Sequence, residues 1–201
     1  LDAPEEMGGS DLPATVMLAI CEKLWSTVTP FTFPPDSPNL LMLDAVATPE
    51  QKKMYMEPYA KGEMKSCIAI SEPGAGGDPA QMKTRAVKDG DDWVINGRKI
   101  WVSNVPAADF IILMATTDPG KGARGGITAF IIEQDMPGFS IEREIPMLGG
   151  SRTYELVMDD LRVPESQVLG EVGEVYAPMH MRLTVRRMEL CARCIGMAEP
   201  A

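Results

Sequence analysis

Apolar side chains recur with two different spacings along the chain, and the change between them falls near Gly62. Residues 14–28 carry apolar side chains at helical spacing, which predicts a first helix. A second helix is predicted from Thr48, whose hydroxyl can cap a helix that opens with Pro49, and it should end near Gly62. The Pro-rich stretch 29–39 between the two helices is typical of an irregular connection.

After Gly62 the pattern changes to short runs rich in β-branched and aromatic residues, separated by turn dipeptides such as Asn96-Gly97 and Pro137-Gly138. The runs lie at residues 67–71, 82–88, 93–103, 110–116, 127–132, 139–143 and 154–158. No segment as long as a crossover helix intervenes. The sheet should therefore be mainly antiparallel, as in a barrel or sandwich, and not a parallel βαβ fold.

Helical spacing returns after Gly173 and predicts a mostly buried helix. Its broad apolar face is formed by Met181, Val185, Met188, Ala192 and Ile195. Arg182, Arg186, Glu189 and Arg193 occupy the remaining face. On that face Glu189 can pair with Arg193 one turn away.

Together these patterns predict an α+β fold in three parts. N-terminal helices are expected at residues 1–64, the β domain at 65–164, and a further helical segment at 165–201. The chain opens without Met and stops inside a helical pattern, so both ends look like cuts in a longer protein.

Composition narrows the class of protein. With 201 residues, 45% of them hydrophobic, the chain can bury a sizeable core. A net charge of -10 argues against a nucleic acid partner. No apolar run approaches the roughly 20 residues that cross a bilayer, so we expect a soluble protein without a membrane partner.

The four cysteines are too dispersed for a compact disulfide framework, and we expect reduced thiols. Cys191 and Cys194 form a C-x-x-C motif, which occurs in zinc sites and redox sites. There is no second cysteine pair, and His180, the single histidine, lies upstream of the first one. We therefore predict no metal site and interpret this pair as buried helix cysteines.

The sharpest local feature is the segment Cys67-Ile-Ala-Ile-Ser-Glu-Pro-Gly-Ala-Gly-Gly-Asp78, a strand that enters a glycine-rich turn. Such a turn can present backbone N–H groups to a phosphate. A nicotinamide-type site is excluded, because Pro79 stands at the third glycine position and strand-like residues follow. A tight turn without a ligand is the alternative.

A second candidate is Lys99-Ile-Trp-Val-Ser-Asn104. Strand alternation puts Trp101 and Ser103 on one face, with Ile100 and Val102 on the other. A flat, electron-accepting ring can rest against the indole while the serine bonds to a ring nitrogen. The alternative is a core tryptophan beside an ordinary strand serine.

These two segments, in this order and spacing, resemble the acyl-CoA dehydrogenase family. Further similar segments are Pro4-Glu-Glu-Met-Gly-Gly9, Thr48-Pro-Glu-Gln-Lys-Lys-Met-Tyr55, Asp92-Trp-Val-Ile-Asn-Gly-Arg-Lys99, Asp160-Leu-Arg-Val-Pro164 and Leu169-Gly-Glu-Val-Gly173. The resemblance spans nearly the whole chain. It implies the end of an N-terminal helical domain, a middle β domain that binds flavin, and the first helix of a truncated C-terminal helical domain.

The resemblance also implies a set of site residues for FAD. Ser71 would lie near the pyrimidine edge of the flavin, Gly76 and Gly77 would face the pyrophosphate, and Ser103 would bond at flavin N5, where substrate hydride arrives. The full cofactor-binding set is Ile68, Ala69, Ile70, Ser71, Gly76, Gly77, Trp101, Val102 and Ser103. Gly77 and Arg187 are the implied contacts to the acyl-CoA substrate.

Three departures from the family pattern limit this transfer. At Gly77 many relatives carry serine, so only the backbone N–H remains there. The loop at residues 146–154 lacks the family's usual arginine, so no role is assigned to it. The position of the catalytic glutamate in one branch of the family is occupied by Arg186, which stays protonated and cannot accept a proton.

In most family members the catalytic glutamate lies in the C-terminal helical domain, most of which is absent. Glu189 is the nearest carboxylate, but its position one helical turn before Arg193 predicts that the two pair. No catalytic residue is therefore assigned to these 201 residues, and the piece alone is predicted to lack dehydrogenase turnover.

The implied activity is FAD-dependent α,β-dehydrogenation of an acyl-CoA thioester, with electrons passed on to an electron-transfer flavoprotein. The full-length protein would be a homo-oligomer, a dimer or tetramer, located in the cytoplasm if bacterial and in the mitochondrial matrix if eukaryotic. Two alternatives stay open: an acyl-CoA oxidase or flavin monooxygenase of the same fold, and a noncatalytic scaffold domain.

Overall fold

The computed structural model describes residues 3–27 and 37–199. Its N-terminal part contains a short 3-10 helix (Glu5–Met7), α1 (Ala14–Trp25) and α2 (Ser37–Val46), and then α3 (Pro49–Gln51), a π-helical turn (Lys52–Met56) and α4 (Glu57–Ala60) in direct succession. The Thr48 start is confirmed by a capping box: the Thr48 hydroxyl accepts from the Gln51 N–H, and the Gln51 side chain accepts from the Thr48 N–H.

The interpretation of residues 29–39 as an irregular connection is wrong at its C-terminal end, because α2 begins at Ser37. Pro38 occupies the first turn of α2, where a missing N–H costs no intrahelical hydrogen bond. Residues 28–36 lie outside the described residues.

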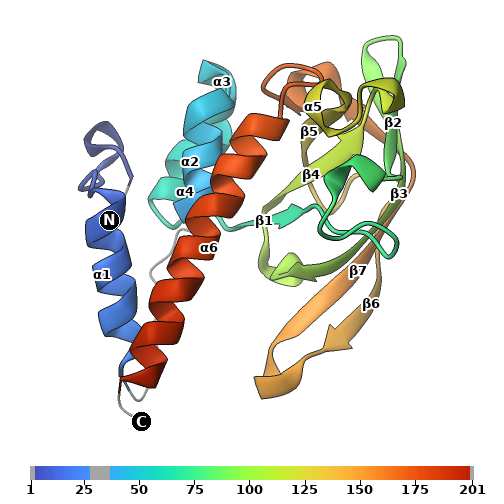
Figure 1. Ribbon diagram of the computed structural model, residues 1–201. Helices are drawn as coiled ribbons and strands as arrows, with labels where there is room; N and C mark the ends of the chain where they lie inside the picture. Colours follow the sequence, from blue (N-terminus) through green and yellow to red (C-terminus); the bar gives the residue numbers. More distant parts are fainter. Residues whose placement is uncertain (1–2, 28–36, 200–201) are drawn as a thin grey trace.

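The predicted α+β class is confirmed: an eight-stranded, mostly antiparallel sheet lies beside the helices, with the strand order β6-β7-β3-β2-β4-β5-β8 (Figure 1). The strands are β1 (Ser66–Ala69), β2 (Arg85–Asp89), β3 (Asp92–Ser103), β4 (Phe110–Thr116), β5 (Ile127–Ile132), β6 (Phe139–Pro146), β7 (Arg152–Pro164) and β8 (Val168–Leu169). All seven predicted runs form strands, and β8 was missed. β1 and β2 each pair with β4 in parallel, whereas the pairings of β3, β5 and β7 are antiparallel.

Strand β4 separates two hydrophobic cores and is buried along its whole length. Ile111, Leu113 and Ala115 face a core enclosed by the strands, which also contains Trp93 and Phe130. Phe110, Ile112 and Met114 face a second core beneath the helices. There Tyr55 and Tyr59 pack their rings against Phe110, with centroids 5.2 and 5.7 Å away.

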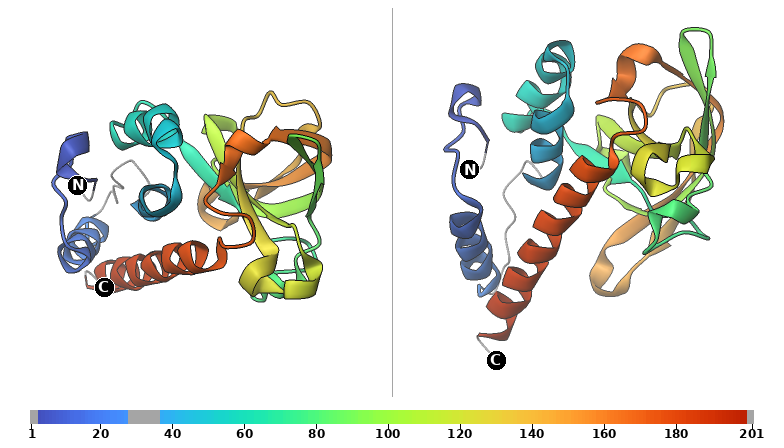
Figure 2. Two further views of the ribbon diagram at one scale, coloured as in Figure 1. Left: turned by 90° about the horizontal axis from the view of Figure 1, so that it is seen from above. Right: turned by 45° about the horizontal axis from the view of Figure 1, so that its top comes forward.

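The last element is the long helix α6 (Tyr176–Ala198), which runs alongside α1 (Figures 1 and 2). The short helix α5 (Ala123–Gly126) lies between β4 and β5 in the sequence. The predicted burial of the apolar face of α6 is wrong: Met181, Met188 and Ile195 are exposed. α6 instead turns its charged side toward α1 and α2. There Arg182 donates to Asn39 (2.9 Å), and Arg193 stacks on the Trp25 ring.

The charged side of α6 is buried because its groups are paired. The predicted contact between Glu189 and Arg193 is present at 3.8 Å, and Arg186 lies closer to Glu189, at 2.9 Å. Cys191 and Cys194 are exposed on this helix, so their interpretation as buried cysteines is wrong as well. None of the four cysteines forms a disulfide.

Candidate functional site

The glycine-rich turn follows β1 and is closed by paired backbone hydrogen bonds between Glu72 and Ala75. A Cβ atom added at Gly74, Gly76 or Gly77 would meet nothing within 4 Å, and none of the three has a left-handed φ. Glycine is therefore not required here by backbone conformation. Its effect is to leave open space over exposed backbone, where a ligand can approach the N–H groups.

A β-bulge interrupts β3 at the second candidate segment. Between the pairs Lys99↔Leu156 and Val102↔Tyr154, β3 has one residue more than β7. Trp101 lies in this bulge with φ of 62°, a left-handed conformation that bulky side chains rarely adopt. Its side chain is 53% exposed. Strain of this kind persists where the surrounding structure holds it, and it is concentrated at functional sites.

The structure brings these two segments side by side. The Ile100 N–H donates to the Ser71 carbonyl oxygen (2.9 Å), and the Lys99 ammonium donates to the Ile70 carbonyl oxygen (3.1 Å). The glycine-rich turn therefore begins next to the bulge that carries Trp101. This contact joins residues that are about 30 positions apart in the chain.

Burial divides the predicted cofactor residues into two groups. Ala69 and Val102 are buried in the core enclosed by the strands, so they can offer a ligand only their backbone. The others retain access to solvent at their side chains or, for glycine, at the backbone: Ile68, Ile70, Ser71, Gly76, Gly77, Trp101 and Ser103. Ile100 and Val102 are buried while Trp101 and Ser103 are exposed, which is the predicted division, but the bulge interrupts the alternation and Lys99 is buried next to Ile100.

A buried ion pair lies directly behind the contact between the two segments. Lys99 is fully buried, and its ammonium lies 2.8 Å from Glu72 Oε1. Burial lowers the pKa of Lys99 to about 8, against the opposing influence of Glu72. Burial raises the pKa of Glu72, but the Lys99 ammonium and the N–H groups of Lys83 and Thr84 outweigh it, so this pKa lies below its usual value.

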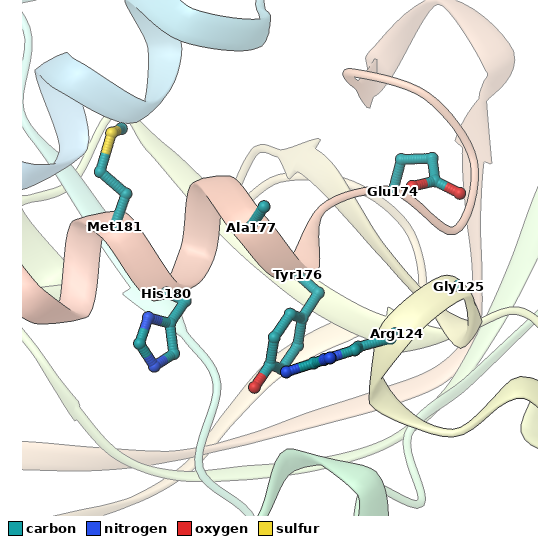
Figure 3. Close-up of a pocket in the computed structure, with 7 residues that line it drawn as sticks. All are labelled: Arg124, Gly125, Glu174, Tyr176, Ala177, His180 and Met181. Carbon is teal, nitrogen blue, oxygen red and sulfur yellow. The ribbon is translucent and has the colours of Figure 1, made fainter.

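A pocket of about 670 Å³ lies where α5 meets the start of α6 (Figure 3). Tyr176 and His180 project from successive turns of α6, and the Arg124 guanidinium lies over the Tyr176 ring, 5.6 Å from its centroid. The lining residues are Arg124, Gly125, Glu174, Tyr176, Ala177, His180 and Met181. An aromatic ring, a cation and a helix N-terminus in one pocket suit an anionic ligand with an apolar portion.

Arg187 is exposed on α6 two helical turns beyond His180, about 10 Å further along the axis and on nearly the same face. It is not among the residues that line the pocket. In the described ranges 3–27 and 37–199, no helix is both long and apolar enough to span a membrane, and no three His, Cys, Asp or Glu residues gather as a metal site.

Sequence profiles of two domains match this chain: the acyl-CoA dehydrogenase N-terminal domain at residues 1–63 and the middle domain at residues 67–161. The chain belongs to the acyl-CoA dehydrogenase family. The matched middle domain contains both the glycine-rich turn and the bulge of β3. The family resemblance predicted from the sequence is thereby confirmed.

Individual proteins are similar over nearly the whole chain. (R)-benzylsuccinyl-CoA dehydrogenase of Thauera aromatica is 38% identical over 99% of this chain and 50% of its own length. Butyryl-CoA dehydrogenase from Megasphaera elsdenii has a structure that matches with a TM-score of 0.84 at 31% identity, over 98% of this chain and 54% of its own. A structure of PigA with FAD and proline matches with a TM-score of 0.87 at 28% identity, over 98% and 53%.

The chain thus spans about half the length of the relatives it matches. Acyl-CoA dehydrogenases bind FAD.

Sequence reasoning missed the pocket and the buried ion pair. Arg124, Tyr176 and His180 come from segments more than 50 residues apart, and no local pattern joins them. Lys99 did carry a signal, because it stands beside apolar residues in a strand that is otherwise buried at alternate positions.

Proposed function

We propose that the full-length protein is an acyl-CoA dehydrogenase in which this chain provides the FAD site and part of the acyl-CoA site. The observation that supports this most is the contact between Ile100 and Ser71, because it puts an open glycine turn beside a strained, half-exposed tryptophan. A turn with accessible N–H groups suits a pyrophosphate, and an exposed indole suits the face of a flavin ring.

Each segment then has a separate task. The backbone N–H groups of Gly76 and Gly77 would bind the pyrophosphate, and Ser71 would bond to the pyrimidine edge of the flavin. Trp101 would cover the ring, and the Ser103 hydroxyl or N–H would donate toward N5. FAD supplies the acceptor for the hydride that leaves the β carbon of the acyl thioester. Ile68, Ala69, Ile70 and Val102 would line the cofactor through backbone or apolar contacts.

The acyl-CoA substrate carries phosphates, and the pocket beside α5 offers them a cation. We assign Arg124 and His180 to the phosphate-bearing end of CoA, with Tyr176 as an apolar wall. Arg187 lies further along the same face of α6 and would contact the substrate there, with the Gly77 backbone as a second contact.

The proton of the α carbon requires a base from outside these 201 residues. Arg186 cannot accept a proton, and the Glu189 carboxylate is held between Arg186 and Arg193. The chain by itself would therefore bind ligands without turnover. Electrons would leave to an electron-transfer flavoprotein, and the full-length protein would assemble as a homo-oligomer.

Reduction by substrate tests this proposal. The full-length protein should purify yellow, and under anaerobic conditions an acyl-CoA should bleach the flavin absorbance near 450 nm and yield an enoyl-CoA. Rapid oxygen consumption with acyl-CoA would favour an oxidase or monooxygenase of the same fold. Protein that is colourless after incubation with FAD and removal of the unbound cofactor would instead indicate a noncatalytic scaffold.

A further inference from the structure

The buried pair of Lys99 and Glu72 joins three segments of the chain that meet behind the proposed flavin site. Glu72 Oε1 accepts from the Lys99 ammonium (2.8 Å) and from the Thr84 N–H (2.9 Å), while Oε2 accepts from the Lys83 N–H (2.7 Å). The Lys99 ammonium also donates to the Ile70 carbonyl oxygen (3.1 Å). The glycine-rich turn, the segment before β2, and β3 are therefore tied together at a single carboxylate.

Stability alone does not account for this arrangement. Moving a lysine and a glutamate out of water is costly, and a well-packed apolar pair of similar volume is often at least as stable. The side chains of Lys99 and Glu72 are 0% and 4% exposed, so neither charge is relieved by solvent. An ion pair differs from an apolar pair in having directional hydrogen bonds. These bonds fix the angle and register of the segments that the pair joins.

Lys99 and Glu72 are close in sequence to residues that we propose contact the flavin. Glu72 directly follows Ser71, and Lys99 lies two residues before Trp101. The backbone near the pair is also closely packed. β3 passes so close to Thr84 that a Cβ atom added at Gly97 would lie 2.6 Å from the Thr84 Cα atom. A shift of the pair would therefore move the glycine-rich turn relative to the bulge.

We propose that Lys99 and Glu72 are positioning residues of the cofactor site, which hold the turn at residues 71–77 in register with the bulge at Trp101 so that both face the same flavin. This inference rests on the proposed FAD function. Because both side chains are buried, the pair would act on the cofactor only indirectly. Its effect passes through the backbone of Ile70, Ser71 and Ile100, which it keeps in one arrangement before the cofactor arrives.

Two variants of the full-length protein test the inference. Glu72→Gln keeps the shape of the side chain and removes its charge, and Glu72→Gln/Lys99→Met removes both charges without leaving one unpaired. The exposed pair of Lys52 and Asp44 (2.7 Å) provides a matched control as Asp44→Asn/Lys52→Met. The measurements are the Kd for FAD from flavin fluorescence, the visible spectrum of the bound flavin, and hydrogen exchange of the 71–77 amides without FAD.

We expect the double variant to melt cooperatively near the wild-type temperature and to bind FAD more weakly by roughly 10- to 100-fold, the range seen when groups that orient metal ligands are removed. The flavin spectrum should lose fine structure, and the 71–77 amides should exchange faster. Glu72→Gln leaves the buried Lys99 ammonium without its charged partner, so it should move in the same direction by at least as much, and the control pair should leave all three measurements unchanged.

Wild-type Kd, spectrum and exchange in both Glu72 variants would overturn the inference. If the double variant fails to fold, the isosteric Glu72→Gln decides alone by the same three measurements. Wild-type protein that binds no FAD would overturn the proposed function. In that case the exchange of the 71–77 amides in the variants still decides whether the pair positions the turn.

Discussion

Gly196 of α6 lies directly against the backbone carbonyl of Glu22 in α1, so that a Cβ atom at position 196 would overlap the Glu22 oxygen. The two helices meet here at backbone distance. Because an oxygen of the main chain cannot rotate away as a side chain does, any larger residue must push the helices apart.

Gly196→Ala should therefore destabilise the chain. Overpacking costs about 1–3 kcal/mol, with the upper end expected against a main-chain oxygen, and the gain of about 1 kcal/mol in helix propensity offsets part of it, which leaves a net loss of up to about 2 kcal/mol. Denaturant unfolding measures this, with the exposed Met197→Ala on the same helix as the control. A Gly196→Ala protein as stable as the wild type would contradict the close approach of α1 and α6.

Trp101→Gly and Trp101→Ala separate backbone strain from the function of the indole. Both variants remove the ring, but only glycine relieves the left-handed φ of 62°. The glycine variant should be more stable than the alanine variant by about 1 kcal/mol. Both should bind FAD more weakly than the wild type. Equal stability of the two variants would mean that the bulge does not hold residue 101 in this conformation.

Gly77→Ser should be accepted without loss of stability, within about 0.5 kcal/mol, because the added side chain enters open space. The new hydroxyl is placed to donate to the pyrophosphate, so FAD should bind tighter by a few-fold. Gly138→Ser is the contrasting variant, since Gly138 has φ of +91° and a Cβ there would lie 2.8 Å from Leu161 backbone atoms. Weaker FAD binding by Gly77→Ser would argue against a phosphate at this turn.

Lowering the pH should reduce the free energy of unfolding, in part because Glu72 becomes protonated. Its pKa is lower in the folded chain than its ordinary value of 4.5, so its contribution is fully present above that pH and is lost as the pH falls through the folded value. The stability difference between the wild type and Glu72→Gln should shrink steadily below pH 4.5. Urea melts from pH 7 to pH 3 measure it, with the exposed Glu63→Gln as control. A difference that does not change with pH would refute a charged Glu72.

Arg124→Gln should raise the KM for acyl-CoA by roughly tenfold at low salt, because a charge-assisted bond to a phosphate is lost. The Kd for FAD should stay at the wild-type value, since Arg124 belongs to the pocket beside α5. Arg162→Gln, which breaks an exposed pair with Asp89, is the control and should change neither constant. An unchanged KM in Arg124→Gln would remove this pocket from the substrate site.

The periodic parts of the fold could be predicted from the sequence, because a period reports which face of an element is apolar. The strands β4 and β5 lie where the pattern puts them, and the capped start at Thr48 does too. The start of α2 was missed, because Pro38 suggests a break although a first helical turn accepts proline.

Partners from distant segments could not be predicted. Arg182 and Glu189 are buried because α2 and their own helix provide hydrogen bonds, which a pattern along α6 does not reveal. In the candidate site, too, local patterns could be predicted and contacts between distant segments could not. The turn and the Trp101 segment were each recognisable, whereas the bulge and the buried Lys99 depend on the pairing of β3 with β7 and with the turn.

Strand β4 contributes alternate side chains to both hydrophobic cores, so the helical layer and the β layer share one wall. Loss of the helices would leave Phe110, Ile112 and Met114 facing water, and loss of the strands would do the same to Ile111 and Leu113. Neither layer can melt first without exposing half of this strand. We therefore expect the chain to unfold in a single concerted transition, and the proposed flavin turn, which follows β1 beside β4, to be lost in the same transition.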